Sequence, residues 1–169
     1  VFVVGLGVLL YPSISSYWNS ITQSRAIVDY DTIMKSLSPK DYSKLYAAAD
    51  EYNEKLAALK FPLAEYEQVE GYDECLNAAQ NGVMGYIDID KIQVKLPIYH
   101  GTDPSILNNA CGHIKGTSLP VGGEGTHCVL SAHRGLPLAK LFSDLDKLEV
   151  GDVFRVTVLD RTLIYQVDQ

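Results

Sequence analysis

The stretch VLSAHRGLPLAKLFSDL, residues 129–145, says most about the fold and chemistry of this chain. Its aliphatic start is typical of a strand, and the small residues that follow indicate where the strand ends. His133 and Arg134 come next, directly before a glycine that frees the backbone. Because imidazole titrates near neutral pH, a histidine placed at a strand end is a candidate acid or base. The stretch therefore raises the question of whether His133 is catalytic and, if it is, where its partner lies.

The residues on both sides of this stretch predict further strands. Apolar residues at 92, 94, 96 and 98 alternate strictly with Gln93, Lys95 and Pro97, which indicates one buried and one exposed face. Pro97 favours an edge strand or a bulge. Residues 153–167 predict a hairpin that turns near Asp160. We therefore expect a mainly β fold over residues 81–169, in the form of a β-barrel or sandwich.

Residues 13–80 predict a helical region in front of this β domain. The clearest helix lies within 36–59, where Ser38 is a candidate N-cap and Pro39 suits the first turn. Asp41, three residues after Ser38, completes a pattern like a capping box. A further acidic helix is expected within 63–77.

The first residues, 1–12, are almost entirely apolar or glycine. A helix needs about 20 apolar residues to cross a bilayer, so this run alone is too short. We interpret it as the remnant of a transmembrane or signal-anchor segment, with Tyr11, Tyr17 and Trp18 near the membrane interface. The alternative is a short buried helix or strand.

Composition excludes several classes of protein. Of the 169 residues, 47% are apolar and 21% are charged, which is typical of a globular domain. The net charge of −7, without a cluster of basic residues, argues against a nucleic-acid partner. The three cysteines, Cys75, Cys111 and Cys128, do not form the pattern of a disulfide scaffold.

Three kinds of chemistry are candidates for the site around His133. A metal site built from Cys111, His113, His127 and Cys128 is disfavoured, because the spacing matches no common zinc motif. A serine hydrolase is disfavoured because no GxSxG motif is present. A cysteine–histidine pair needs a thiol beside His133. Cys128 is the nearest in sequence, but at five residues along an extended strand it faces the opposite side.

Two long segments of the chain resemble a known family. The segments GVMGYIDIDKIQVKLPIYHGT and GHIKGTSLPVGGEGTHCVLSAHRGLPLAKLFSDLDKLEVGDVF, together with TLIYQVDQ, are similar to class C sortases. These enzymes are the pilin polymerases of Gram-positive bacteria. The resemblance runs from Gly82 to Gln169.

The resemblance implies a sortase-like closed β-barrel and a cysteine transpeptidase that needs no cofactor and no metal. Such an enzyme cleaves an LPXTG-like sorting signal on pilins or other surface proteins. It then joins the acyl group to a lysine of the next pilin subunit through an isopeptide bond. His133 matches the family's catalytic histidine, and the membrane anchor implies the extracellular face of a Gram-positive cell.

The sequence departs from the family pattern at two places. The family's nucleophile lies in a TLxTC motif and its arginine on a later strand, and neither motif occurs in residues 1–169. Arg134 does not match that arginine. We therefore expect an incomplete barrel and an inactive fragment, which a second chain could complete. The alternatives are a non-catalytic sortase-like binding module, or a cell-wall-anchoring sortase of another class.

The second departure concerns a lid. Many class C sortases carry an Asp-Pro-aromatic plug before the barrel, whereas this chain has only Phe61-Pro62 there. Residues 60–68 are therefore interpreted either as a lid in which Phe61 or Tyr66 acts as the plug, or as a plain connection.

Overall fold

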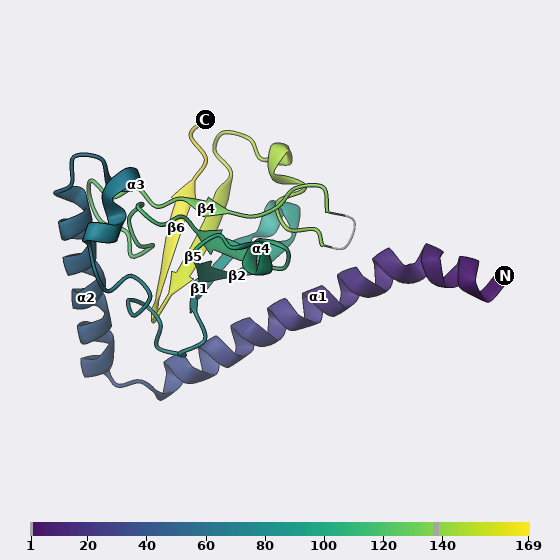
Figure 1. The fold of residues 1–169 in the computed structure, drawn as a ribbon, viewed down its shortest axis with the longest axis horizontal. Helices are drawn as coiled ribbons and strands as arrows, with labels where there is room; N and C mark the ends of the chain where they lie inside the picture. The colour runs from purple at the N-terminus through teal and green to yellow at the C-terminus, as the bar shows by residue number, and fades with distance from the viewer. Residues whose placement is uncertain (1, 137–138) are drawn as a thin grey trace.

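The computed structural model describes residues 2–136 and 139–169, so Val1 and the Pro137–Leu138 part of the 129–145 stretch lie outside the described residues. Figure 1 shows a long N-terminal helix, a second helix and a curled sheet. The helices are α1 (Phe2–Ser36), α2 (Pro39–Ala57), α3 (Pro62–Glu65) and α4 (Pro104–Leu107), with single turns η1 (Tyr66–Gln68), η2 (Asp90–Ile92) and η3 (Leu145–Lys147). The strands are β1 (Val83–Ile89), β2 (Val94–His100), β3 (Cys111–His113), β4 (Leu130–Ser131), β5 (Val153–Val158) and β6 (Arg161–Gln166).

Within the described residues, the six strands form one sheet in the order β4-β3-β2-β1-β5-β6. Every neighbouring pair is antiparallel except β2 and β3, which α4 connects. Residues from β4 at one edge and β6 at the other line the same cavity, so the sheet curls strongly. The expected closed barrel is thus an open half-barrel over these residues, and the long helices make the fold mixed α/β instead of mainly β.

The strand predictions are largely confirmed. The four apolar residues at 92, 94, 96 and 98 are all buried, and the hairpin turns between Val158 and Arg161. The prediction of an edge strand at Pro97 is wrong, because β2 lies inside the sheet between β1 and β3. β2 pairs with β3 only from Ile98 onwards. Pro97 has no N–H to donate, and it has no partner residue in β3 that would need one.

The cap of α2 forms as the sequence predicts. The backbone N–H of Ser38 donates to the Asp41 carboxylate at 3.0 Å, and the N–H of Asp41 donates back to the Ser38 hydroxyl at 3.3 Å. The expected helix over 63–77 is limited to α3 and η1. Val69 is extended at the end of η1, and Gly71 adopts a left-handed φ of +94°, which a helix cannot contain.

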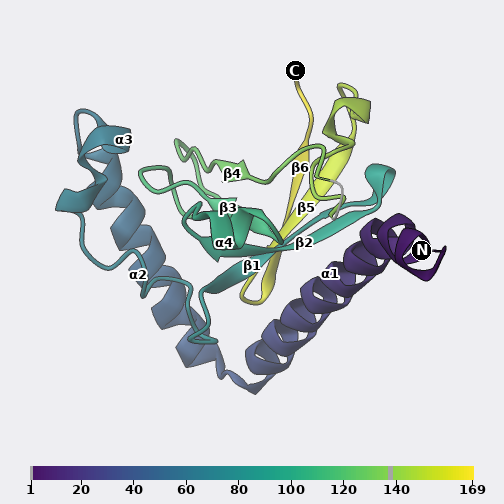
Figure 2. The same cartoon turned by 45° about the vertical axis from the view of Figure 1, so that its right-hand side comes forward.

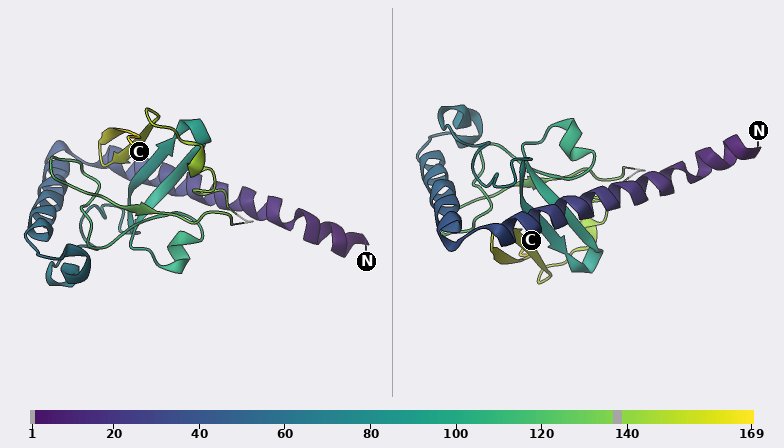
Figure 3. Two further views of the ribbon diagram at one scale, coloured as in Figure 1. Left: turned by 90° about the horizontal axis from the view of Figure 1, so that it is seen from above. Right: turned by 90° about the horizontal axis from the view of Figure 1, so that it is seen from below.

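The helices α1 and α2 form a V around the sheet (Figure 2). α1 packs on β1 and β2, and its N-terminal part extends beyond the sheet (Figure 3). The helix runs through residue 12 with Pro12 inside it, so the expected boundary between 12 and 13 is not marked by a break. In the part of the chain that the structure describes, no helix combines the length and apolar character needed to cross a membrane.

Two buried tyrosines attach these helices to the far end of the sheet. The hydroxyl of Tyr30 on α1 donates to the Met84 carbonyl at 2.8 Å and accepts the N–H of Leu159 at 2.7 Å. From α2, the hydroxyl of Tyr46 donates to the Val158 carbonyl at 2.9 Å. The turn between β5 and β6 is therefore held by both arms of the V.

We expect Tyr30→Phe to lower the free energy of unfolding by about 1–3 kcal/mol, because it leaves a buried carbonyl and a buried N–H without partners. Chemical denaturation monitored by circular dichroism measures this. Tyr17→Phe, on the exposed part of the same helix, is the control and should change stability by less than about 0.5 kcal/mol. Equal stability of the two variants would contradict the assignment of this contact.

Candidate functional site

The structure places His133 just beyond the edge strand β4, with its side chain exposed. Its carbonyl oxygen accepts the N–H of Phe142 at 3.1 Å, and the N–H of Gly135 donates to the Ser143 hydroxyl at 3.0 Å. Arg134 forms an ion pair with Asp146 at 3.0 Å, but both side chains are more than half exposed, so the pair stabilises the loop little. Backbone contacts therefore fix the histidine at the rim of the sheet while its ring stays open to solvent.

None of the three cysteines is a ready nucleophile. Burial raises the pKa of the Cys111 and Cys128 thiols to about 12, so almost no thiolate forms at neutral pH. Burial also raises the pKa of Cys75, whose sulfur lies 3.6 Å from the Ala48 carbonyl on α2. A thiolate partner for His133 is therefore not offered by any of these three residues in their observed positions.

The hollow side of the curled sheet holds a groove of about 580 Å³. One wall comes from the β3–β4 loop, and the others come from β1, β4, β5, β6 and the 142–148 segment. Its lining is mostly apolar, with Leu119, Pro120, Leu130, Phe142, Leu148, Phe154 and Tyr165 among the residues that contribute. Cys128 and His127 also line this groove. His133 is not part of the lining and follows Leu130 by three residues.

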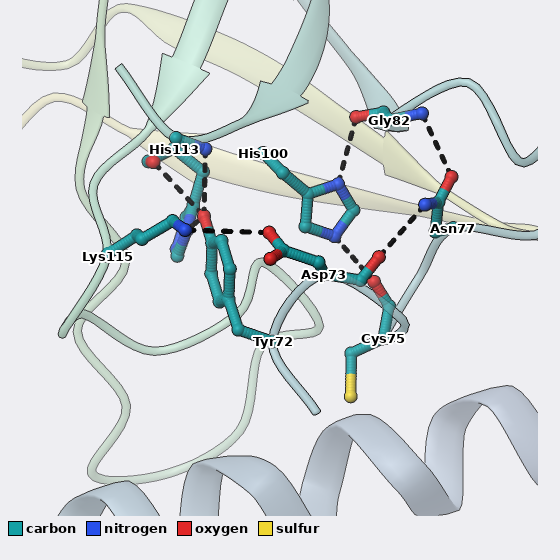
Figure 4. A network of polar contacts seen from close by, with 9 residues as sticks. Tyr72, Asp73, Cys75, Asn77, Gly82, His100, His113 and Lys115 are labelled. Atoms are coloured by element: carbon teal, nitrogen blue, oxygen red, sulfur yellow. Dashed lines mark hydrogen bonds and ion pairs between the residues drawn. The ribbon is translucent and has the colours of Figure 1, made fainter. Parts of the chain in front are cut away.

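A buried polar network lies behind the β3–β4 loop (Figure 4). The Tyr72 hydroxyl accepts the N–H of Gly101 at 3.0 Å and lies 2.9 Å from Nδ1 of His113. Nε2 of His113 lies 2.9 Å from the carbonyl oxygen of Ser118. Since a carbonyl can only accept, Nε2 carries the proton and Nδ1 accepts the Tyr72 O–H. His113 is thus a structural residue with both ring nitrogens engaged.

His100 belongs to the same region of Figure 4. Its Nδ1 lies 2.9 Å from the Gly82 carbonyl, and its Nε2 lies 2.7 Å from the Cys75 carbonyl. The ring therefore joins the end of β2 to the 72–82 segment that leads into β1.

The candidate lid residues lie away from His133. α3 packs on the β3–β4 loop, where a Cβ added to Gly116 would meet the Leu63 Cα at 2.9 Å. In Figures 1 and 2 the chain runs through β4 in the direction away from α3, and His133 follows β4 by two residues. Phe61 is mostly exposed, so in this structure it plugs no site. A lid role for residues 60–68 stays a prediction.

Sequence reasoning did not assign a role to Asn53, which contacts the β3–β4 loop, and treated His113 only as a candidate metal ligand. One signal was present for Asn53. It falls on the apolar stripe of α2, beside Tyr52 and Leu56, where an amide must find a partner. For His113, the Tyr72 partner is 41 residues away in sequence, and no local pattern reveals it.

The neutral state of His113 makes the stability of the fold depend on pH. Burial lowers the pKa of His113 to about 4, from an ordinary value of 6.5 in the unfolded chain. The contribution of neutral His113 to the free energy of unfolding is therefore complete above about pH 6.5. As the pH falls towards 4, up to about 3 kcal/mol of it is lost. Urea denaturation of the wild type and His113→Gln between pH 7.5 and 4.5 measures it. The difference in the free energy of unfolding between the wild type and His113→Gln should become smaller at low pH. A difference that does not change with pH would contradict the prediction.

Comparison with known proteins relates this architecture to one family. The sortase domain matches residues 87–169. Sortase D of Bacillus subtilis (strain 168) is 34% identical over 83 residues, which cover 49% of this chain. The matched region spans only 39% of the length of that curated relative.

Solved structures match over more of the chain. Sortase C1 from Streptococcus agalactiae has a TM-score of 0.79 and 46% identity, over 86% of this chain and 76% of the other. Streptococcus pneumoniae Sortase C gives a TM-score of 0.71 and 37% identity, over 86% and 74% of the two chains. For sortase C-1 from Actinomyces oris the values are 0.68 and 42%, over 78% and 75%. This chain therefore belongs to the sortase family, and its structural relatives are class C sortases.

Proposed function

We propose that this chain is the histidine-bearing part of a cysteine transpeptidase that acts on LPXTG-like sorting signals. The observation that supports this most directly is the placement of His133, whose exposed ring follows the free edge strand β4 on a fold shared with sortase C1. An edge strand can accept a further strand along its open side. A residue on such a strand would come to lie beside His133.

The partner in this proposal is a cysteine thiolate other than Cys75, Cys111 and Cys128. It is supplied by a segment outside residues 1–169 or by a second chain that completes the barrel. Residues 1–169 alone are then inactive. The groove beside β4 takes the sorting signal, whose leucine and proline suit its apolar lining.

The proposed reaction has two steps. The thiolate attacks the carbonyl carbon of the signal's threonine, and the peptide C–N bond breaks as His133 gives a proton to the leaving amine. An acceptor amine then attacks the thioester, and His133 takes a proton from that amine as the thiolate leaves. The acceptor in this proposal is a lysine side chain of a pilin subunit, so the product is an isopeptide bond.

The structure of Streptococcus pneumoniae Sortase C bears on the pilin substrate specificity of that enzyme, which supports pilins as the substrate class here. Sortases act at the surface of Gram-positive cells. We place this protein on the extracellular face of the membrane, anchored through residues 1–12. The exposed apolar side chains of Leu9, Tyr17 and Trp18 on the protruding part of α1 support that anchor.

We expect His133→Ala, in the product of the complete gene, to lower transpeptidation of an LPXTG-type peptide by at least about 100-fold, because the leaving amine loses its proton donor. Mass spectrometry of the product joined to a lysine-containing pilin peptide measures this. Lys147→Ala, an exposed residue on the segment behind the histidine loop, is the control.

The same assay separates the alternatives. Unchanged activity of His133→Ala would contradict the assignment of His133 as the acid and base of the reaction. Binding of the peptide without any cleavage by the wild type would favour a sortase-like binding module. Transfer to a cell-wall amine in preference to lysine would favour a cell-wall-anchoring sortase.

A further inference from the structure

Asn53 makes a two-point contact with the backbone of the β3–β4 loop. The side chain lies on the buried face of α2 and is 7% exposed. Its Oδ1 accepts the N–H of Leu119 at 2.7 Å, and its Nδ2 donates to the carbonyl of the same residue at 3.4 Å. The amide thus contacts both backbone groups of Leu119, whose carbonyl also accepts the N–H of Val121 at 2.8 Å. Because the site is buried, water cannot readily replace these contacts.

The preceding residue is held from the other side. Ser118 presents its carbonyl oxygen to Nε2 of His113, which Tyr72 orients through Nδ1. Figure 4 shows the Tyr72 ring beside His113 on the sheet. Ser118 and Leu119, two successive residues of one loop, are therefore hydrogen-bonded by side chains from β3 and α2. The loop has no regular strand or helix of its own between residues 114 and 129 to fix its shape.

This double contact reaches both flanks of the loop that forms one wall of the groove. Leu119 and Pro120, with Gly122 and Gly123 beyond them, form one wall. Ser118 connects to His127, which also lines the groove. The N–H of Ser118 donates to the His127 carbonyl at 2.9 Å, and the His127 N–H donates to the Ser118 hydroxyl at 3.1 Å. A shift at 118–119 would therefore move both flanks of the loop.

We propose that Asn53 is a positioning residue that sets the shape of the β3–β4 wall and thereby the affinity for the sorting signal. The helical region in front of the sheet then has a role in substrate binding, although it does not line the groove. The substrate named in this inference rests on the proposed function. The contact between Asn53 and Leu119 is observed in the structure and does not depend on that function. Asn53 lies on α2 and acts through Leu119, so it should affect peptide binding more than the chemical step.

The test uses the product of the complete gene with Asn53→Ala and Asn53→Asp. Hydrogen exchange measured by NMR follows the Leu119 amide, and kinetics with an LPXTG-type peptide give KM and kcat. We expect Asn53→Ala to speed exchange at Leu119 by at least about 10-fold and to raise KM about 10-fold, with kcat changed less than about threefold. Asn53→Asp keeps the acceptor for the Leu119 N–H. The backbone amide of Leu119 should therefore exchange its hydrogen more slowly in Asn53→Asp than in Asn53→Ala.

Two controls separate positioning from lost stability. Ala49→Gly, one turn earlier on the same buried face of α2, weakens the helix but keeps the Asn53 amide. Glu54→Gln changes an exposed neighbour. The proposal is overturned if Ala49→Gly raises KM as much as Asn53→Ala, or if Leu119 exchange is the same in Asn53→Ala and the wild type. If the wild type has no activity on any sorting peptide, the proposed function fails, and the exchange result still decides whether Asn53 fixes the wall.

Discussion

The buried hydroxyl of Tyr30 is the contact on which the arrangement of helix and sheet depends. One oxygen serves the carbonyl of Met84 in β1 and the N–H of Leu159 in the turn after β5. Leu159 adopts a left-handed φ of +54°, an unfavourable conformation for leucine, and the tyrosine satisfies its N–H there. Since β1 lies in the middle of the sheet, this one hydroxyl connects α1 both to the centre of the sheet and to the β5–β6 turn.

The structure combines an exposed histidine at the rim of the sheet with thiols in apolar surroundings. His133 is open to solvent on a loop whose backbone is fixed, which suits a group that exchanges protons with a bound substrate. Cys111 and Cys128 lie in apolar surroundings that keep them protonated. Such thiols behave as small apolar side chains. Proximity of Cys128 to His133 in sequence therefore says nothing of the reactivity of its thiol.

Local patterns predicted the elements well and the contacts between them poorly. The alternation from Ile92 to Ile98 and the Ser38–Asp41 cap are both local, and the structure confirms both. The helix expected over 63–77 failed because apolar spacing there was outweighed by the turn at Gly71. The position of His133 after a strand was readable from sequence, but the Asn53–Leu119 contact was not. It joins residues 66 apart, and no local pattern reports such a separation.

The contacts that α2 makes with the sheet also set an order of events during synthesis. Tyr46 leaves the ribosome early, yet its hydrogen-bond partner Val158 follows 112 residues later. At typical translation rates of about 5–20 residues per second, Tyr46 therefore waits about 6–22 seconds before Val158 is made. Contacts of such long sequence separation also slow folding. The connection between α2 and the β5–β6 turn is therefore among the last contacts of this region to form.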